Sequence, residues 1–436
     1  MNCIPASGTD NCASSPPVAG FGRRSGAGVM LALATLLWGD AHTQDGTPDA
    51  ARDLIYRLEY IVRPDFEAGG AFVELHLRQP RRLLRAFDMR APSEVFSDFG
   101  GDGDVSAAND RLLWTPPDGG GALRWFARID HKRNGESYDA YISEDWAIFR
   151  AEDIMPPAAT RSLKGARSET SLRFVLPSGW SSATEYFGRD HVYRTENPER
   201  AFDRPAGWMI VGRIGTRVET IAGVRTKIAA PIGHGVRRMD ILAMLHWTMP
   251  DVLRLLPDFP GRLTIISAGD PMWRGGLSGP RSMFLHAERP LISENATSTL
   301  LHEIMHIGLA RGAGANVDWV VEGLAEYYGL EILRRSGTIS ERRFRAALNR
   351  LEQWGNEAHS LCRSNASGAV TAKAVTVMRD LDREISAHSA GSESLDDVIR
   401  ALAADEEITM SGFRSAVVEL LGEDADALNN LAGCGD

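Results

Sequence analysis

Hydrophobic and polar residues alternate over much of the first half of the chain. The clearest runs lie at residues 56–62, 73–77, 123–129 and 172–176. A period of two places successive side chains on opposite faces of a strand, and glycine- and aspartate-rich turns separate the runs. We therefore predict an antiparallel β-sandwich-like domain over residues 50–200. Two more strand-like runs follow, at residues 208–220 and 223–230.

The apolar spacing changes to a helical period near residue 235. A helical pattern at residues 236–256 precedes a short apolar strand at residues 262–268. Beyond residue 295 nearly every segment has the spacing of an amphipathic helix. The expected helices span residues 295–310, 319–334, 340–354, 369–385, 394–403 and 411–421. Ser394 and Asp397 form the pattern of a capping box at the start of one of them. The sequence thus predicts an α+β chain whose second domain, residues 201–436, is mainly helical.

The N-terminal segment has the pattern of an export signal. Arg23 and Arg24 precede an apolar run, Val29–Trp38, which small residues follow. This order is typical of a secretory signal peptide, and the run is too short to span a bilayer as a stable helix. We expect residues 1–44 to be a signal peptide or disordered segment and the mature chain to be periplasmic or extracellular. The alternative is a tail that stays attached, tethered or disordered. No other stretch has the length and apolarity of a membrane span.

Charge and cysteine content narrow the function classes. The formal net charge is −10, which argues against nucleic acid as a partner because phosphate binding needs a concentrated basic face. Cys3 and Cys12 would leave with the signal. In an oxidising compartment Cys362 and Cys434 could form a disulfide bridge, or they could be two unrelated thiols. None of the four has the spacing of a metal-ligand pair.

The segment His302-Glu303-Ile304-Met305-His306 carries the chemistry. On a helix, positions four apart lie one turn apart on the same face, so both imidazoles can reach one Zn2+. Glu303 stands beside the first histidine and can accept a proton from a metal-activated water. The other interpretation of this short motif is a surface helix that carries His and Glu for solubility.

A catalytic zinc usually has three protein ligands and an open position. Residues 319–328 supply two carboxylates one helical turn apart, Glu322 and Glu326. We predict Glu322 as the third ligand and Glu326 as the partner that fixes a ligand histidine, with the reverse assignment as the alternative. Gly323 is expected to let this helix approach the metal helix closely, and Asp318 is expected to be its N-cap.

With these segments the chain resembles the gluzincin zinc metallopeptidases, and most closely the glycyl-aminopeptidase-like relatives of the aminopeptidase N group. The resemblance rests on the His302–His306 segment, on residues 319–328, which match a W-x-x-E-G-x-x-x-Y-Y pattern, and on residues 394–400, which resemble S-L-D-D-V-x-R. It implies a thermolysin-like catalytic domain after the β-domain, one zinc per chain, a peptide or protein substrate and Glu322 as ligand. The spacing of Glu326 from His306, in contrast, is typical of thermolysin-like enzymes.

Two departures from the family pattern concern the substrate. The family carries a G-G-L-E-H segment, whereas this chain has Gly275-Gly276-Leu277-Ser278-Gly279, with serine where an acid would hold a free amine. The family tyrosine that is thought to stabilise the oxyanion has no counterpart after Tyr328. His359 and Arg363 are the candidates for that role.

The glycine-rich segment also has its own interpretation. An edge strand at Gly275, Gly276 and Leu277 could pair with an extended peptide through main-chain hydrogen bonds, or the segment could be a surface loop. The sequence therefore predicts a zinc-dependent peptidase with Glu303 as general base. The alternatives are a catalytically impaired zinc protein that binds peptides, and an aminopeptidase whose amine anchor has moved to Glu326.

Overall fold

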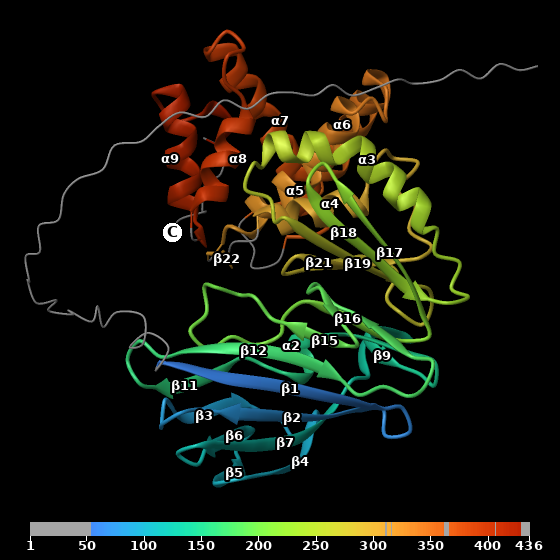
Figure 1. Ribbon diagram of the computed structural model, residues 1–436. Coiled ribbons are helices and arrows are strands. Elements are labelled where there is room, and N and C mark those ends of the chain that lie inside the picture. The colour runs from blue at the N-terminus through green and yellow to red at the C-terminus, as the bar shows by residue number, and fades with distance from the viewer. Residues whose placement is uncertain (1–53, 310–311, 315, 362–365, 406, 429–436) are drawn as a thin grey trace, which may run out of the picture. The chain divides into compact units, whose positions relative to one another are not determined.

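The computed structural model describes residues 54–309, 312–314, 316–361, 366–405 and 407–428 (Figure 1). The predicted export signal and the predicted bridge between Cys362 and Cys434 lie outside these residues. Among the helices of the described part, none combines the length and apolarity needed to cross a membrane.

The N-terminal part is built from three sheets. A seven-stranded sheet has the order β14-β15-β12-β1-β2-β7-β4. Its strands are β1 (Ile55–Asp65), β2 (Gly70–Arg78), β4 (Phe96–Gly101), β7 (Gly120–Arg128), β12 (Arg167–Phe174), β14 (Gly188–Arg189) and β15 (Val192–Arg194). A four-stranded sheet consists of β11 (Ala158–Ser162), β3 (Leu84–Arg90), β6 (Arg111–Thr115) and β5 (Asp104–Ala108), in that order. A five-stranded sheet consists of β13 (Ser181–Ala183), β16 (Trp208–Gly212), β10 (Trp146–Arg150), β9 (Ser137–Ile142) and β8 (His131–Asn134), and the short helix α2 (Ala151–Ile154) follows β10.

The predicted alternation of apolar residues corresponds to burial on one face of these strands. Tyr56, Leu58, Tyr60 and Val62 of β1 are all buried, and they share one core with residues of the other two sheets. The pairing is mostly antiparallel, as predicted, but β1 and β12 run parallel, because a long connection joins them rather than a tight turn.

A mixed sheet opens the second part of the chain. Its order is β17-β18-β19-β21-β20, with β17 (Ile214–Ile221), β18 (Val224–Pro231), β19 (Arg262–Ala268), β20 (Gly276–Gly279) and β21 (Ser282–His286). The strand-like run at residues 208–220 is thus two strands of two different sheets, divided at Arg213: β16 pairs with β10, and β17 pairs with β18. The domain boundary placed after residue 200 stays a prediction.

Seven helices follow the expected pattern with small shifts at their ends. They are α3 (Arg238–Leu255), α4 (Thr299–Leu309), α5 (Asp318–Arg335), α6 (Glu341–Gly355), α7 (Ala369–His388), α8 (Leu395–Ala404) and α9 (Met410–Leu421). Short pieces complete the described part: β22 (Gly312–Ala313), β23 (Glu407–Ile408) and a 3-10 turn, Asp426–Leu428. The capping box predicted at Ser394 is confirmed, because its side chain accepts from the Asp396 N–H and its own N–H donates to Asp397. A sheet-rich part followed by a helical part is therefore the observed order, as predicted.

Each face of the mixed sheet packs against a different layer. One face shares a large core with the helices, which gather beside it in Figure 1. The other face packs Ile266 and Phe284 against Trp146, Ile148 and Trp208 of the five-stranded N-terminal sheet. The central strand β19 is covered on both faces, which explains why its residues 263–268 are all buried instead of alternating between buried and exposed.

A buried lysine lies where segment 184–186 meets the mixed sheet. Lys227 of β18 is 5% exposed, and its Nζ donates to the carbonyls of Thr184 (2.7 Å) and Tyr186 (2.8 Å). Burial, with the nearby charge of Arg225, lowers its pKa to about 7. Both carbonyls have a second partner, a threonine hydroxyl in each case.

This lysine predicts a specific pH dependence of stability. Because its folded pKa lies below the usual lysine value, the unfolded chain binds more protons between pH 7 and 10, and the free energy of unfolding should rise with pH there. We expect Lys227→Met to flatten that rise by about 1–3 kcal/mol between pH 7 and 9.5, measured by urea unfolding. The exposed Lys164→Met is the control. Equal slopes in both variants would contradict the assignment.

Candidate metal centre

Helix α4 carries two histidines on one side and a core face on the other. Leu301, Ile304 and Met305 are buried in the helical core, whereas His302 and His306 are half-buried. The Ser298 hydroxyl accepts a hydrogen bond from the Leu301 N–H and so caps the first turn. The helix begins at Thr299, four residues later than predicted, because residues 293–297 form a hydrogen-bonded turn instead.

The two imidazoles converge on one carboxylate of α5. The Nε2 atoms of His302 and His306 lie 3.1 Å apart, and each lies 3.4 Å from an oxygen of Glu322. Among the described residues this is the one group of three that could hold a metal ion, with ligand atoms within 4.8 Å of one another. Two imidazole nitrogens and one carboxylate oxygen are donors that zinc prefers, so the residues present fit a zinc ion.

Glu326 lies on the opposite side of the first imidazole. Its Oε2 is 3.0 Å from Nδ1 of His302, whereas Glu322 faces Nε2 of the same ring. A carboxylate on Nδ1 selects the tautomer whose Nε2 is free for a metal, which is the usual arrangement around ligand histidines. This geometry favours Glu322 as the metal ligand and Glu326 as the residue that orients His302.

The charges of this group are those of a cation site. Burial would lower the pKa of His302, but hydrogen bonds with Glu322 and Glu326 outweigh it and raise that pKa to about 10. Burial and the positive charge of His302 lower the pKa of His306 to about 4. Burial would raise the pKa of Glu322, but its interactions with His302 and His306 hold that pKa below its usual value. The two histidines thus keep one positive charge beside Glu322. A bound metal cation would replace that charge.

Glu303 is buried against the edge strand of the mixed sheet. It is 7% exposed, and burial raises its pKa, although the charge of His302 and the nearby polar groups of Ser278 act against that. Gly276 permits the contact, because a Cβ there would lie 2.6 Å from Thr299 Cγ2 and 2.9 Å from Glu303 Cγ. In the sequence, Ser278 is noted only as a departure from the family pattern. In the structure it lies beside Glu303.

Strand β20 is the terminal strand of its sheet, and among the described strands it pairs with β21 alone. Gly276 and Ser278 face α4, and Leu277 packs toward the opposite face. Gly275 precedes the strand, and its carbonyl accepts from the His286 N–H. The segment is thus an edge strand beside Glu303 rather than a surface loop. Its role in substrate binding stays a prediction.

Two expectations about α5 were wrong. Gly323 does not face α4: a Cβ there would lie 2.8 Å from Ala374 Cβ, so this glycine allows close packing of α5 on α7. Asp318 is not the N-cap, since Val317 holds that position. The Asp318 carboxylate instead accepts the Ala366 N–H at 2.6 Å and ties the start of α5 to the segment before α7.

In the described part of the chain, no contact joins either candidate for the oxyanion role to His302, His306 or Glu322. His359 is exposed after α6, and Arg363 lies outside the described part. The tyrosines of α5 are engaged elsewhere: Tyr327 donates to Asp382 and Tyr328 to Asp396. Sequence reasoning also missed a cavity of about 360 Å3 beside the metal group, which is lined by Asn295, Thr297, His302, Glu322, Glu326, Ala347, Arg350, Leu351, Trp354, Ala366, Ser367, Gly368, Thr371 and Ala372.

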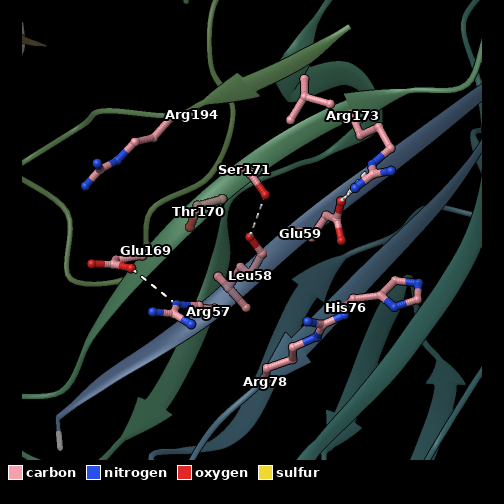
Figure 2. Close-up of a pocket in the computed structure, with 11 residues that line it drawn as sticks. Arg57, Leu58, Glu59, His76, Arg78, Glu169, Thr170, Ser171, Arg173 and Arg194 are labelled. Atoms are coloured by element: carbon pink, nitrogen blue, oxygen red, sulfur yellow. Dashed lines mark hydrogen bonds and ion pairs between the residues drawn. The ribbon is translucent and has the colours of Figure 1, made fainter. Parts of the chain in front are cut away.

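Figure 2 shows a second hollow, of about 420 Å3, on the outer face of the seven-stranded sheet. It shares no residue with the metal group. Its carboxylates are paired across strands, Glu59 with Arg173 at 2.6 Å and Glu169 with Arg57 at 3.4 Å. Such pairs are typical of a solvated sheet face, and we assign this hollow no chemistry.

Comparisons with known proteins place the fold. No protein-family model and no curated protein matches the sequence. Among solved structures, an aminopeptidase N family protein from Idiomarina loihiensis is similar at a TM-score of 0.62, with 15% identity over 79% of this chain and 70% of the other. A glutamate-to-alanine mutant of an M1 zinc metallopeptidase from Deinococcus radiodurans is similar at 0.54, with 13% identity over 88% and 93% of the two chains. A second structure of the M1 enzyme from that organism gives 0.51, again with 13% identity, over 84% and 90%. The chain therefore has the fold of the M1 zinc metallopeptidases, and the resemblance seen in the sequence is confirmed at that level.

The two carboxylates of α5 can be told apart by metal affinity. We expect Glu322→Gln to abolish tight zinc binding, and Glu326→Gln to weaken it about 10- to 100-fold, because a supporting residue only orients its histidine. Competition with a chromogenic chelator measures both, and the exposed Glu357→Gln is the control. The opposite order, with Glu326→Gln the more damaging, would make Glu326 the ligand.

Proposed function

We propose that this chain is a zinc-dependent peptidase of the M1 type, with a thermolysin-like catalytic domain. The observation that carries the proposal is the convergence of His302, His306 and Glu322 beside the buried Glu303 and a free sheet edge. The structural neighbours, M1 zinc metallopeptidase structures and an aminopeptidase N family protein, support it.

The chain's own residues divide the work of amide hydrolysis. His302, His306 and Glu322 would hold one zinc ion, which supplies the Lewis acidity that polarises a carbonyl and acidifies a water. Glu303 accepts the proton of that water and later passes it to the leaving amine. The free edge of β20 would align an extended peptide by main-chain hydrogen bonds.

The aminopeptidase alternative needs a carboxylate that is free to bind an amine. Ser278 stands where the family has an acid, and it lies beside Glu303 and lowers the pKa of that carboxyl group. Glu326, the proposed substitute anchor, is engaged with His302 at 3.0 Å. Both contacts favour cleavage that does not depend on a free N-terminus. We also propose that the chain acts outside the cytoplasm, on the strength of Arg23, Arg24 and the apolar run that follows them.

Zinc content and hydrolysis, measured together, test the proposal. We expect about one zinc per chain in the parent and in Glu303→Gln, with hydrolysis of N-terminally blocked fluorogenic peptides only in the parent. A loss of at least about 10³-fold in kcat would fit the removal of a general base.

The other outcomes separate the alternatives. Cleavage only of peptides with a free N-terminus would favour the aminopeptidase. Zinc in both chains without hydrolysis of any peptide would favour an inactive peptide-binding relative. Absence of zinc from both would refute the metal site itself.

A further inference from the structure

The cavity beside the metal group lies where a substrate side chain must go. His302 and Glu322 form part of its wall, so a carbonyl held at the metal site places the neighbouring side chain in this space. The remaining wall comes from α6, from the turn before α4 and from the segment that leads into α7. Its volume, about 360 Å3, is ample for one side chain.

One side of the cavity is apolar and pre-shaped. Ala347, Leu351, Trp354 and Ala372 line it. Trp354 is 46% exposed, and its ring lies close to Gly368, where a Cβ would be 3.5 Å from Trp354 Cζ2. The segment that leads into α7 is fixed by the hydrogen bond from the Ala366 N–H to Asp318. An aliphatic stem fits between these groups.

Arg350 supplies the one positive side chain among the described residues of this wall besides the metal-site histidine. Its guanidinium donates to the amide oxygen of Asn295, a neutral partner, and it forms no ion pair with any carboxylate of the described residues. A guanidinium has five N–H donors, and toward the described residues only the bond to Asn295 uses one of them.

The charges around the cavity favour an anion once the metal site is filled. Glu322 and Glu326 are both turned to the histidines, and a bound Zn2+ would balance their two negative charges. The net charge of the cavity wall is then positive, because of Arg350. We propose that this cavity selects an acidic side chain next to the scissile bond, with its stem against Leu351 and Trp354 and its carboxylate on Arg350. This inference rests on the proposed peptidase function and names its substrate class.

Binding to an inactive, zinc-loaded chain tests the inference separately from catalysis. Two peptides, acetyl-Ala-Glu-Ala-amide and acetyl-Ala-Gln-Ala-amide, differ in one group that neighbours either internal amide bond. Calorimetric titration of Glu303→Gln should show about three- to tenfold tighter binding of the glutamate peptide at 0.05 M salt, falling as salt rises. Adding Arg350→Gln should remove the difference, whereas adding Arg342→Gln, an exposed arginine of the same helix outside the cavity wall, should leave it.

Equal affinity for the two peptides, an unchanged preference in the Arg350→Gln chain, or no binding of either peptide at millimolar concentration would each overturn the inference. The outcome is distinct from that of the proposed function. A glutamate preference without hydrolysis by the parent chain would leave the cavity assignment in place and refute the peptidase. Hydrolysis without a preference would do the opposite.

Discussion

The candidate site depends on the placement of one helix, α5. Its side toward α4 carries Glu322 and Glu326, which meet the histidines, and Gly323 lets it pack closely on α7. Any shift of α5 along its axis by a single residue would rotate the carboxylates about 100° away from the imidazoles. The fold therefore has to fix both the rotation and the height of this helix, and it does so with buried hydrogen bonds rather than with apolar packing alone.

Those hydrogen bonds come from the middle and the C-terminal end of the same helix. Tyr327 donates to Asp382 of α7, which also accepts the N–H of Leu395 at the start of α8. Tyr328 donates to Asp396 at 2.9 Å, and Arg335 binds the same carboxylate with two nitrogens. Two segments that resemble the family pattern, residues 319–328 and 394–400, thus touch each other. Directional bonds of this kind specify register, which apolar contacts specify poorly.

Local patterns were sufficient wherever one face of an element is buried against one partner. The alternation of β1 and the helical spacing of α4 predicted both elements, and the spacing of α4 also predicted that His302 and His306 lie together, since i and i+4 share a helix face. Long-range facts were not accessible in this way. Whether Gly323 faces α4 or α7, how residues 208–220 divide between two sheets, and that Arg350 and Trp354 border the metal group all depend on tertiary packing. Ser278 shows this limit most clearly. The sequence shows that an acid is absent from this position, and only the structure shows that the serine lies beside Glu303.

That contact changes how the absent acid should be understood. An acidic residue at position 278 would place a second carboxylate against Glu303, and two carboxylates in a buried site raise each other's pKa. Serine instead lies beside Glu303 and lowers its pKa, which partly offsets the effect of burial. Where the family carries an acid that would hold a free amine, this chain has a serine beside Glu303, the proposed base. With Glu326 engaged on His302, the proposed recognition of substrate rests on Arg350, whose charge would attract a carboxylate rather than an amine. The proposed substrate is therefore the interior of an acidic peptide rather than a free N-terminus, because the charge of Arg350 opposes the binding of an amine there and Glu326 is already engaged.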